Sequence, residues 1–333
     1  MAEKEWYHEI DVLRGLTIFA MIVIHASVYF QEDKTAYFLW DLLQFAVPVF
    51  LFCSAYISFK RNQTVELSKF PSYIGKRLKR LLFPYWIFLL FYVPLVYFYD
   101  SSQMTMGQIL RFATLTTSGN DVSWLVLLFA MSAVLIPFML FLNKKHIVLF
   151  WTFGTLSFVG SIFLLVFQSP VHFKLMMWFP WTLMFYFTWY FAQEENSKER
   201  LIELFITTTI LYAFLFYWLP LRGNSIVHYE NKYPPNLFHL SYGMSWIVLL
   251  YYLAKKKVFA LPGLKQLVSF LSRRSYSIYF IHFLILYVMT TYYKGVFLKL
   301  AWWQFFAVLF VSSVSAQLLM GSLRRVIPLS ARS

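Results

Sequence analysis

Hydrophobic residues in this chain come in long runs that are separated by shorter polar connections. Several runs hold few charges and exceed roughly 18 residues, the length at which a helix crosses the hydrocarbon core of a bilayer. We predict about ten such spans and therefore an all-α, polytopic membrane helix bundle. The spans lie at roughly residues 12–30, 38–58, 82–99, 122–142, 147–167, 173–192, 201–220, 236–253, 275–293 and 300–320.

The composition supports lipid as the solvent of this fold. Hydrophobic residues make up 60% of the chain and charged residues 13%, whereas soluble domains have about 45–50% apolar and about 25% charged residues. Because the apolar runs recur along the chain, we interpret residues 1–333 as a single integral-membrane domain. The one cysteine, Cys53, excludes an intramolecular disulfide, and we predict no metal site. Packing explains Cys53 better than a role as an acyl carrier.

The distribution of basic residues predicts an orientation. With the N-terminus in the cytoplasm, 21 Lys and Arg residues fall on the cytoplasmic side and 7 on the other, while Arg14 lies at the start of the first span. This asymmetry predicts that both termini are cytoplasmic and that the number of spans is even. It also accounts for the net charge of +14 without a nucleic-acid partner.

The first predicted helix carries a polar stripe formed by Asp11, Arg14 and His25. Eleven residues turn a helix by about 1100°, close to three full turns, so Arg14 and His25 share a face roughly 16 Å apart along the axis. Ionisable groups inside a membrane usually mark a site or pathway, and imidazole suits general-base chemistry near neutral pH. The alternative is structural: Asp11 and Arg14 form an interfacial anchor pair, and His25 bonds to a neighbouring helix.

A second cationic cluster, Lys76-Arg77-Leu78-Lys79-Arg80, precedes the third predicted span. Arg77 and Arg80 are three residues apart, so both guanidinium groups can address one polyanion. We expect the N-terminus of the following helix to add the positive end of its dipole. Positive-inside anchoring explains the same cluster without a ligand.

Other polar residues are weaker candidates. His282 lies inside the ninth predicted span, and we interpret it as a second polar group and not as a catalyst. Asp41, near the outer start of the second span, is a candidate partner for His25. Three further histidines in or near outer loops are expected to be solvated: His172, His228 and His239.

Taken together, several motifs resemble those of the acyltransferase 3 family. The order Asp11-x-x-Arg14-Gly15 followed by His25 is similar to that family's first helix, and Arg77-x-x-Arg80 is similar to its arginine motif. The remaining matches follow in the family's order up to residue 282, and they are Phe45 to Ala55, Ser123-Trp124-Leu125 and Ser275 to His282.

The resemblance implies a ten-helix membrane protein that transfers an acyl group, usually acetyl, from cytoplasmic acyl-coenzyme A. The implied acceptor is a hydroxyl of an extracytoplasmic molecule, commonly a cell-surface glycan, and the implied location is a bacterial plasma or inner membrane. By the same resemblance His25 is catalytic, Arg14 lies along the coenzyme path, and Arg77 and Arg80 hold coenzyme phosphates. Supporting positions are Asp11, Trp124, Tyr279 and His282.

A transporter or flippase of a glycan or small anion is the main alternative. Buried His and Arg residues suit such a carrier as well as an enzyme. Transporters often show two related halves or paired broken helices, and we find neither in this sequence.

Overall fold

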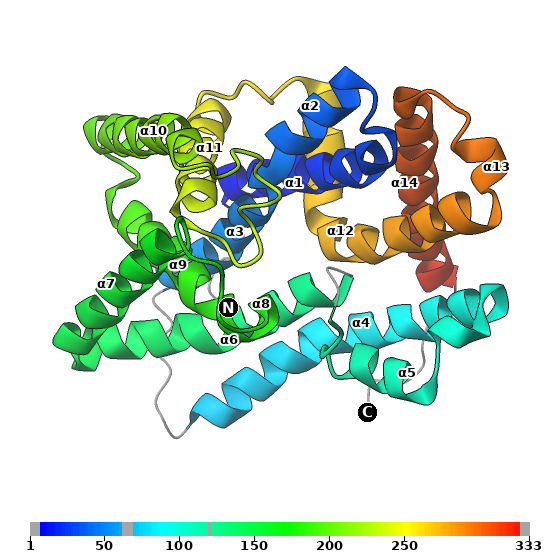
Figure 1. The fold of residues 1–333 in the computed structure, drawn as a ribbon, viewed down its shortest axis with the longest axis horizontal. Coiled ribbons are helices and arrows are strands. Elements are labelled where there is room, and N and C mark those ends of the chain that lie inside the picture. Colours follow the sequence, from blue (N-terminus) through cyan, green and yellow to red (C-terminus); the bar gives the residue numbers. More distant parts are fainter. Residues whose placement is uncertain (1–6, 62–68, 119–121, 327–333) are drawn as a thin grey trace.

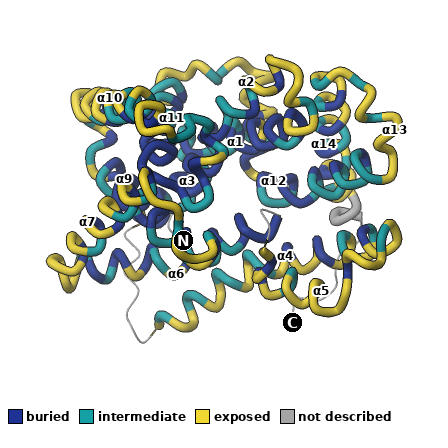
Figure 2. Tube along the Cα trace, in the orientation of Figure 1, coloured by how far each residue is buried: buried dark blue, intermediate teal, exposed yellow. Residues whose placement is uncertain are grey.

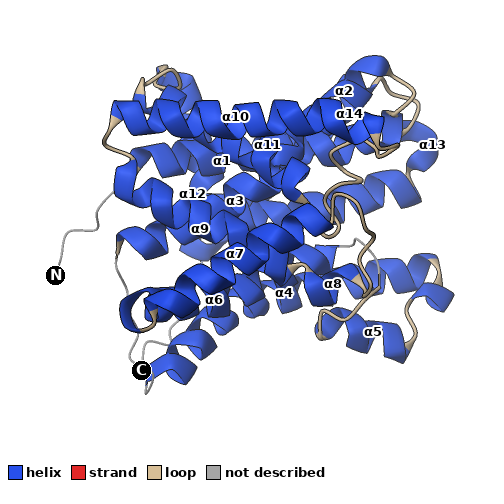
Figure 3. Cartoon of the chain, turned by 60° about the vertical axis from the view of Figure 1, so that its left-hand side comes forward, coloured by secondary structure: helices blue, strands red, loops and turns tan. Residues whose placement is uncertain are grey.

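The computed structural model describes residues 7–61, 69–118 and 122–326, which fold into helices joined by short connections, with no β-strand among them (Figures 1 and 3). Seven segments of these residues are long and apolar enough to cross a membrane. The predicted all-α, polytopic helix bundle is therefore confirmed. These segments are His8–Phe30, Lys34–Lys60, Phe70–Tyr99, Val122–Lys145, Lys198–Leu221, Leu237–Lys255 and Trp302–Ser322.

The helices follow the predicted apolar runs closely. The first half of the chain forms α1 (His8–Ser27), α2 (Lys34–Leu42), α3 (Ala46–Lys60), α4 (Phe70–Tyr99), α5 (Met106–Ala113), α6 (Val122–Lys145) and α7 (Ile147–Phe163). The second half forms α8 (Phe173–Met176), α9 (Trp178–Glu194), α10 (Lys198–Leu221), α11 (Leu237–Lys255), α12 (Pro262–Tyr287), α13 (Lys294–Phe297) and α14 (Trp302–Val326).

Three of the predicted spans coincide with helices that do not meet the length and composition of a membrane span. α7 and α9 have 17 residues each, and α12 begins with a polar stretch at Pro262 before its apolar half. The number ten for the spans therefore stays a prediction, as does the cytoplasmic position of both termini.

The second and third predicted spans also differ from the helices observed. The second span is divided into α2 and α3 by a 3₁₀ turn at Leu43–Phe45, next to Pro48, which has no N–H to bond back to the carbonyl of residue 44. α4 begins at Phe70, with a proline in its first turn, instead of near residue 82. Arg77 and Arg80 thus lie roughly two and three turns inside the helix. The prediction that a helix N-terminus contributes to their site is therefore wrong, because the dipole effect fades beyond the first turn.

α1 lies in the interior of the bundle and packs against α3, α11, α12 and α14 (Figures 1 and 2). The outward faces of peripheral helices are apolar instead of polar: Leu90, Phe98 and Leu221 are 72%, 81% and 83% exposed. A soluble monomer rarely exposes so much contiguous apolar surface. The outside of the bundle is therefore suited to lipid, and polar side chains are concentrated within it.

α1 and α12 touch along their length because Gly15 has no side chain. A Cβ atom at Gly15 would lie 2.3 Å from the backbone oxygen of Val268 on α12, far inside van der Waals contact. Ser272 of α12 donates a 2.8 Å hydrogen bond to Asp11 near the start of α1, and His25 meets His282 near the ends of both helices. The two helices therefore run in the same general direction.

Candidate active site

Half-buried His25 and fully buried His282 form a pair at the contact between α1 and α12. Nδ1 of His25 lies 2.8 Å from Nε2 of His282, and the two rings lie edge to edge in nearly parallel planes with centroids 5.1 Å apart. Phe283 lies against both rings at 4.6 Å. The packing holds the imidazole of His25 in one orientation, with one edge against His282.

The hydrogen bonds indicate which nitrogen carries each proton. Nδ1 of His282 lies 3.0 Å from the carbonyl oxygen of Ile278, one turn earlier in α12. A carbonyl only accepts, so this Nδ1 donates, and in a neutral ring Nε2 is then an acceptor. Nδ1 of His25 therefore donates to His282, which leaves Nε2 of His25 as an unprotonated nitrogen. That nitrogen has the lone pair that a general base requires.

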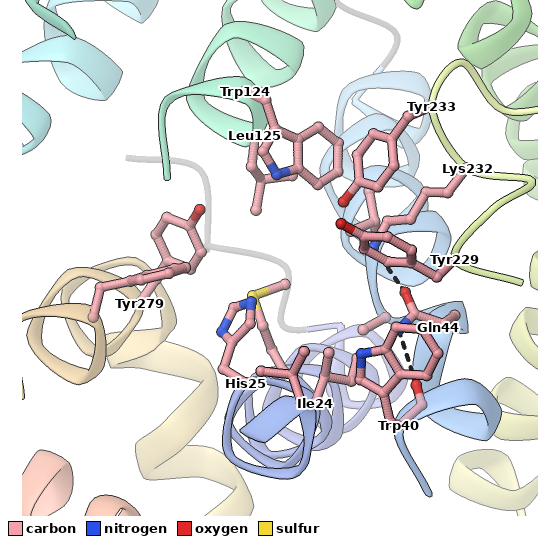
Figure 4. A pocket seen from close by; sticks show the side chains of 15 residues that line it. Ile24, His25, Trp40, Gln44, Trp124, Leu125, Tyr229, Lys232, Tyr233 and Tyr279 are labelled. Carbon is pink, nitrogen blue, oxygen red and sulfur yellow. Dashed lines mark hydrogen bonds between the residues drawn. The ribbon is translucent and has the colours of Figure 1, made fainter. Parts of the chain in front are cut away.

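His25 lines a cavity of about 180 Å³, called here the histidine cavity (Figure 4). Its walls are mostly hydrophobic, with six Phe, Tyr and Trp residues among them, and its polar groups are few. Trp124 and Leu125 enter it from α6, Tyr279 from α12, and Tyr229 with Lys232 from the connection between α10 and α11. A small, largely apolar cavity with a few convergent polar groups is the usual form of a ligand site.

A second cavity of about 610 Å³, the arginine cavity, is lined by four guanidinium groups: Arg14, Arg61, Arg77 and Arg80. Its lining in the described part of the chain includes no carboxylate. Arg77 donates to the Ser58 hydroxyl at 2.9 Å and stacks over the Tyr73 ring at 4.9 Å. Arg14 is paired with Asp11 at 3.5 Å. The structure thus gathers cations from three elements around a space large enough for a polyanion.

Leu125 and Tyr279 line both cavities, so the two cavities adjoin at these side chains, which are called here the wall. The Tyr279 hydroxyl donates to the backbone oxygen of Val122 at 3.2 Å, which ties α12 to the start of α6. Along α1, Arg14 lies beside the arginine cavity and His25 beside the histidine cavity. The stripe predicted on the first helix therefore connects two neighbouring cavities.

Some predicted roles are corrected by the packing. His228 is buried, and both its backbone N–H and its Nδ1 bond to the Asp41 carboxylate at 2.8 Å. Asp41 is thus the partner of His228 and not of His25. His239 is completely buried in α11, against Trp181. These two histidines are not solvated: the connection between α10 and α11 that carries His228 folds onto the bundle, and α11, which carries His239, packs against α1, α3, α9 and α10. Of the three, His172 is the exposed one.

Two site residues were not singled out from the sequence. Arg61 directly follows α3, and from the sequence alone it is one of many basic residues on the predicted cytoplasmic side. Lys232 lies in a connection whose composition is typical of a polar outer loop. The residue is nevertheless 6% exposed and lines the histidine cavity. The aromatic residues around it, Tyr229 and Tyr233, and the two prolines that follow were the available signal for a packed segment.

Comparison with known proteins agrees with this geometry. Residues 7–321 match the family model Acyl_transf_3, described as an acyltransferase domain. No curated protein and no solved structure gives a significant match. The match covers nearly the whole described chain, including both cavities and every residue discussed above. The chain belongs to the acyltransferase 3 family and is a multi-pass membrane acyltransferase.

Proposed function

We propose that the protein moves an acyl group, most simply acetyl, from acyl-coenzyme A to a hydroxyl of a glycan or glycan precursor on the far side of a bacterial plasma or inner membrane. The observation that supports this proposal best is the arrangement of the two cavities. One is lined by cations, the other contains a histidine with an available lone pair, and a single wall separates them.

The arginine cavity suits the donor. Coenzyme A carries several phosphates on its nucleotide and a long, nearly neutral arm that ends in sulfur. Guanidinium groups bind phosphate oxygens in pairs of charge-assisted hydrogen bonds. Arg61, Arg77 and Arg80 hold the nucleotide phosphates, and the arm runs past Arg14 toward Leu125 and Tyr279, where the two cavities adjoin. The thioester end of the arm enters the histidine cavity between these two side chains and reaches His25.

The histidine cavity suits the acceptor. Nε2 of His25 takes the proton of the acceptor hydroxyl as its oxygen bonds to the thioester carbonyl carbon. The carbon–sulfur bond then breaks, and the departing thiolate takes the proton from His25. The products are an ester and coenzyme A thiol. His282 accepts a hydrogen bond from His25 throughout and stabilises the positive charge that His25 carries in the middle of the reaction. In the covalent alternative Nε2 of His25 attacks the thioester carbon and the thiolate leaves, and the acceptor hydroxyl then takes the acyl group from the acyl-histidine and releases His25.

The test is an assay of the purified protein with radiolabelled acetyl-coenzyme A, membranes that contain the acceptor, and detection of released thiol. We expect His25→Ala to lower turnover by about 10²–10⁴-fold, the usual contribution of a general base, with donor affinity retained. His146→Ala is the matched control, because His146 is exposed at the start of α7 and lies outside both cavities. Normal turnover by a folded His25→Ala protein would refute the catalytic role.

A second pair of variants tests the donor site. Replacing Arg77 and Arg80 by alanine should raise the KM for acetyl-coenzyme A by at least about tenfold, because each removes charge-assisted hydrogen bonds. Lys144→Ala with Lys145→Ala removes the same charge from an exposed helix end, and donor KM should not change. Equal effects of the two pairs would mean that general surface charge, and not a phosphate site, governs donor binding.

A further inference from the structure

Lys232 is a buried cation without an acidic partner among the described residues. The residue is 6% exposed, and no carboxylate of the described residues lies within 4 Å of its ammonium. Its partner is neutral: the side-chain oxygen of Gln44, at 3.0 Å. Gln44 donates its own amide N–H to the Trp40 carbonyl at 2.9 Å, which fixes the oxygen toward Lys232 (Figure 4).

A second buried charged residue, in contrast, has an oppositely charged partner. Glu195, 6% exposed, is paired with Lys60 at 2.7 Å and accepts hydrogen bonds from the Tyr56 and Tyr251 hydroxyls. Removing a charge from water costs several kcal/mol unless a partner compensates, and Glu195 has that partner within the chain. Lys232 has instead the faces of Trp124 and Tyr233, at 5.3 and 5.4 Å, which stabilise a cation only modestly.

The position of Lys232 indicates that a counter-anion would bind in the histidine cavity. Lys232 lines the histidine cavity together with His25, and an ammonium has three N–H donors, of which Gln44 uses one. Burial lowers the pKa of Lys232 to about 7. An anion in the cavity therefore gains a charge-assisted hydrogen bond and keeps the ammonium protonated. The donor phosphates do not supply this anion, because the arginine cavity lies on the other side of the wall formed by Leu125 and Tyr279.

We infer that the acceptor carries an anionic group, a carboxylate or a phosphate, that binds Lys232 in the histidine cavity while the hydroxyl to be acylated faces His25. This inference rests on the proposed function and adds the chemical class of the acceptor. The cavity measures only about 180 Å³, below the roughly 300–1,000 Å³ of drug-sized ligand sites, so the anion and the hydroxyl lie on the same sugar or polyol unit. The rings of Trp40, Trp124 and Tyr229 give the apolar face of such a unit a surface to pack against.

The experiment starts from membranes of the cells that make the protein, prepared from a strain that lacks its gene, so that the acceptor is present and unmodified. Purified wild-type protein and labelled acetyl-coenzyme A are added, and the labelled glycan is separated by anion exchange. We expect the label in an anionic fraction. Carboxylates are then reduced to alcohols in one sample, and phosphates are removed with hydrofluoric acid in another. Loss of acceptor activity in one of the two identifies the anion.

Two variants connect the anion with Lys232. Lys232→Met should raise the KM for the anionic acceptor by at least tenfold and leave the KM for acetyl-coenzyme A unchanged. Gln44→Glu keeps both side chains in place and supplies an internal counter-charge, so it should raise acceptor KM in the same way without removing a buried contact. This second variant keeps the inference testable if Lys232→Met does not fold.

The outcomes are distinct. Label in a neutral glycan, an acceptor that works equally well after both treatments, or variants with unchanged acceptor KM would each overturn the inference. Transfer that is lost in His25→Ala yet insensitive to these changes would leave the proposed function intact and refute the anionic acceptor alone. No transfer by the wild-type protein to any fraction would instead refute the proposed function and, with it, the basis of this inference.

Discussion

Replacing His282 by leucine removes the acceptor for the Nδ1 proton of His25 while filling most of the same space. In the wild-type protein this 2.8 Å hydrogen bond keeps the proton on Nδ1 and leaves Nε2 free to act as the base. As His25 takes a proton from the acceptor, the bond becomes one from a charged donor, which is worth about 1.5–3 kcal/mol. At 1.36 kcal/mol per tenfold change in rate, kcat should fall by about 10–150-fold.

The assay separates this positioning role from binding. Because His282 lines neither cavity, the KM for acetyl-coenzyme A should not change in His282→Leu. His282→Gln is the conservative variant, since its side-chain oxygen can accept the same hydrogen bond, and it should restore a large part of kcat. Thermal unfolding in detergent checks that both variants fold. A wild-type kcat in His282→Leu, or a glutamine variant no better than the leucine variant, would refute the reasoning.

Further predictions concern the donor site, the helix contact and the pH dependence. Arg61→Ala should raise donor KM about tenfold, because Arg61 lines the arginine cavity; an unchanged KM would remove it from the site. Gly15→Ala should destabilise the protein by about 1–3 kcal/mol through overpacking against Val268, seen as a lower melting temperature. Since burial lowers the pKa of Lys232 to about 7, its ammonium is lost as the pH rises above that value, and acceptor KM should rise. In Lys232→Arg the guanidinium stays protonated, so acceptor KM should not change over the same pH range. A pH dependence caused by His25 would instead persist in this variant.

The features that depend on local pattern could be predicted from the sequence. Helical periodicity was enough to place Arg14 and His25 on one face of α1, and the structure puts them beside adjoining cavities. Runs of apolar residues located the helices. The start of α4 was predicted too late because Lys and Arg are good helix formers. The basic stretch before residue 82 has the composition of a loop, but it extends the helix.

The features that depend on long-range packing could not be predicted. His25 and His282 are 257 positions apart, and no spacing rule links α1 with α12. The Gly15 contact permits their approach, but a glycine in a helix does not indicate which helix will lie against it. The burial of Lys232 depends on how the connection between α10 and α11 folds over the bundle. Polar composition alone predicts exposure there, and the tertiary contacts reverse that prediction.

The wall formed by Leu125 and Tyr279 has an electrical consequence. In the proposed function one substrate arrives from each side of the membrane, so the two cavities approach each other from opposite sides. A continuous water-filled passage through them would let ions leak down their gradients. Because the two side chains separate the arginine cavity from the histidine cavity, group transfer need not open an ionic path. We expect the protein in a planar lipid bilayer to carry no current under an applied voltage, and Leu125→Gly to make the bilayer leaky.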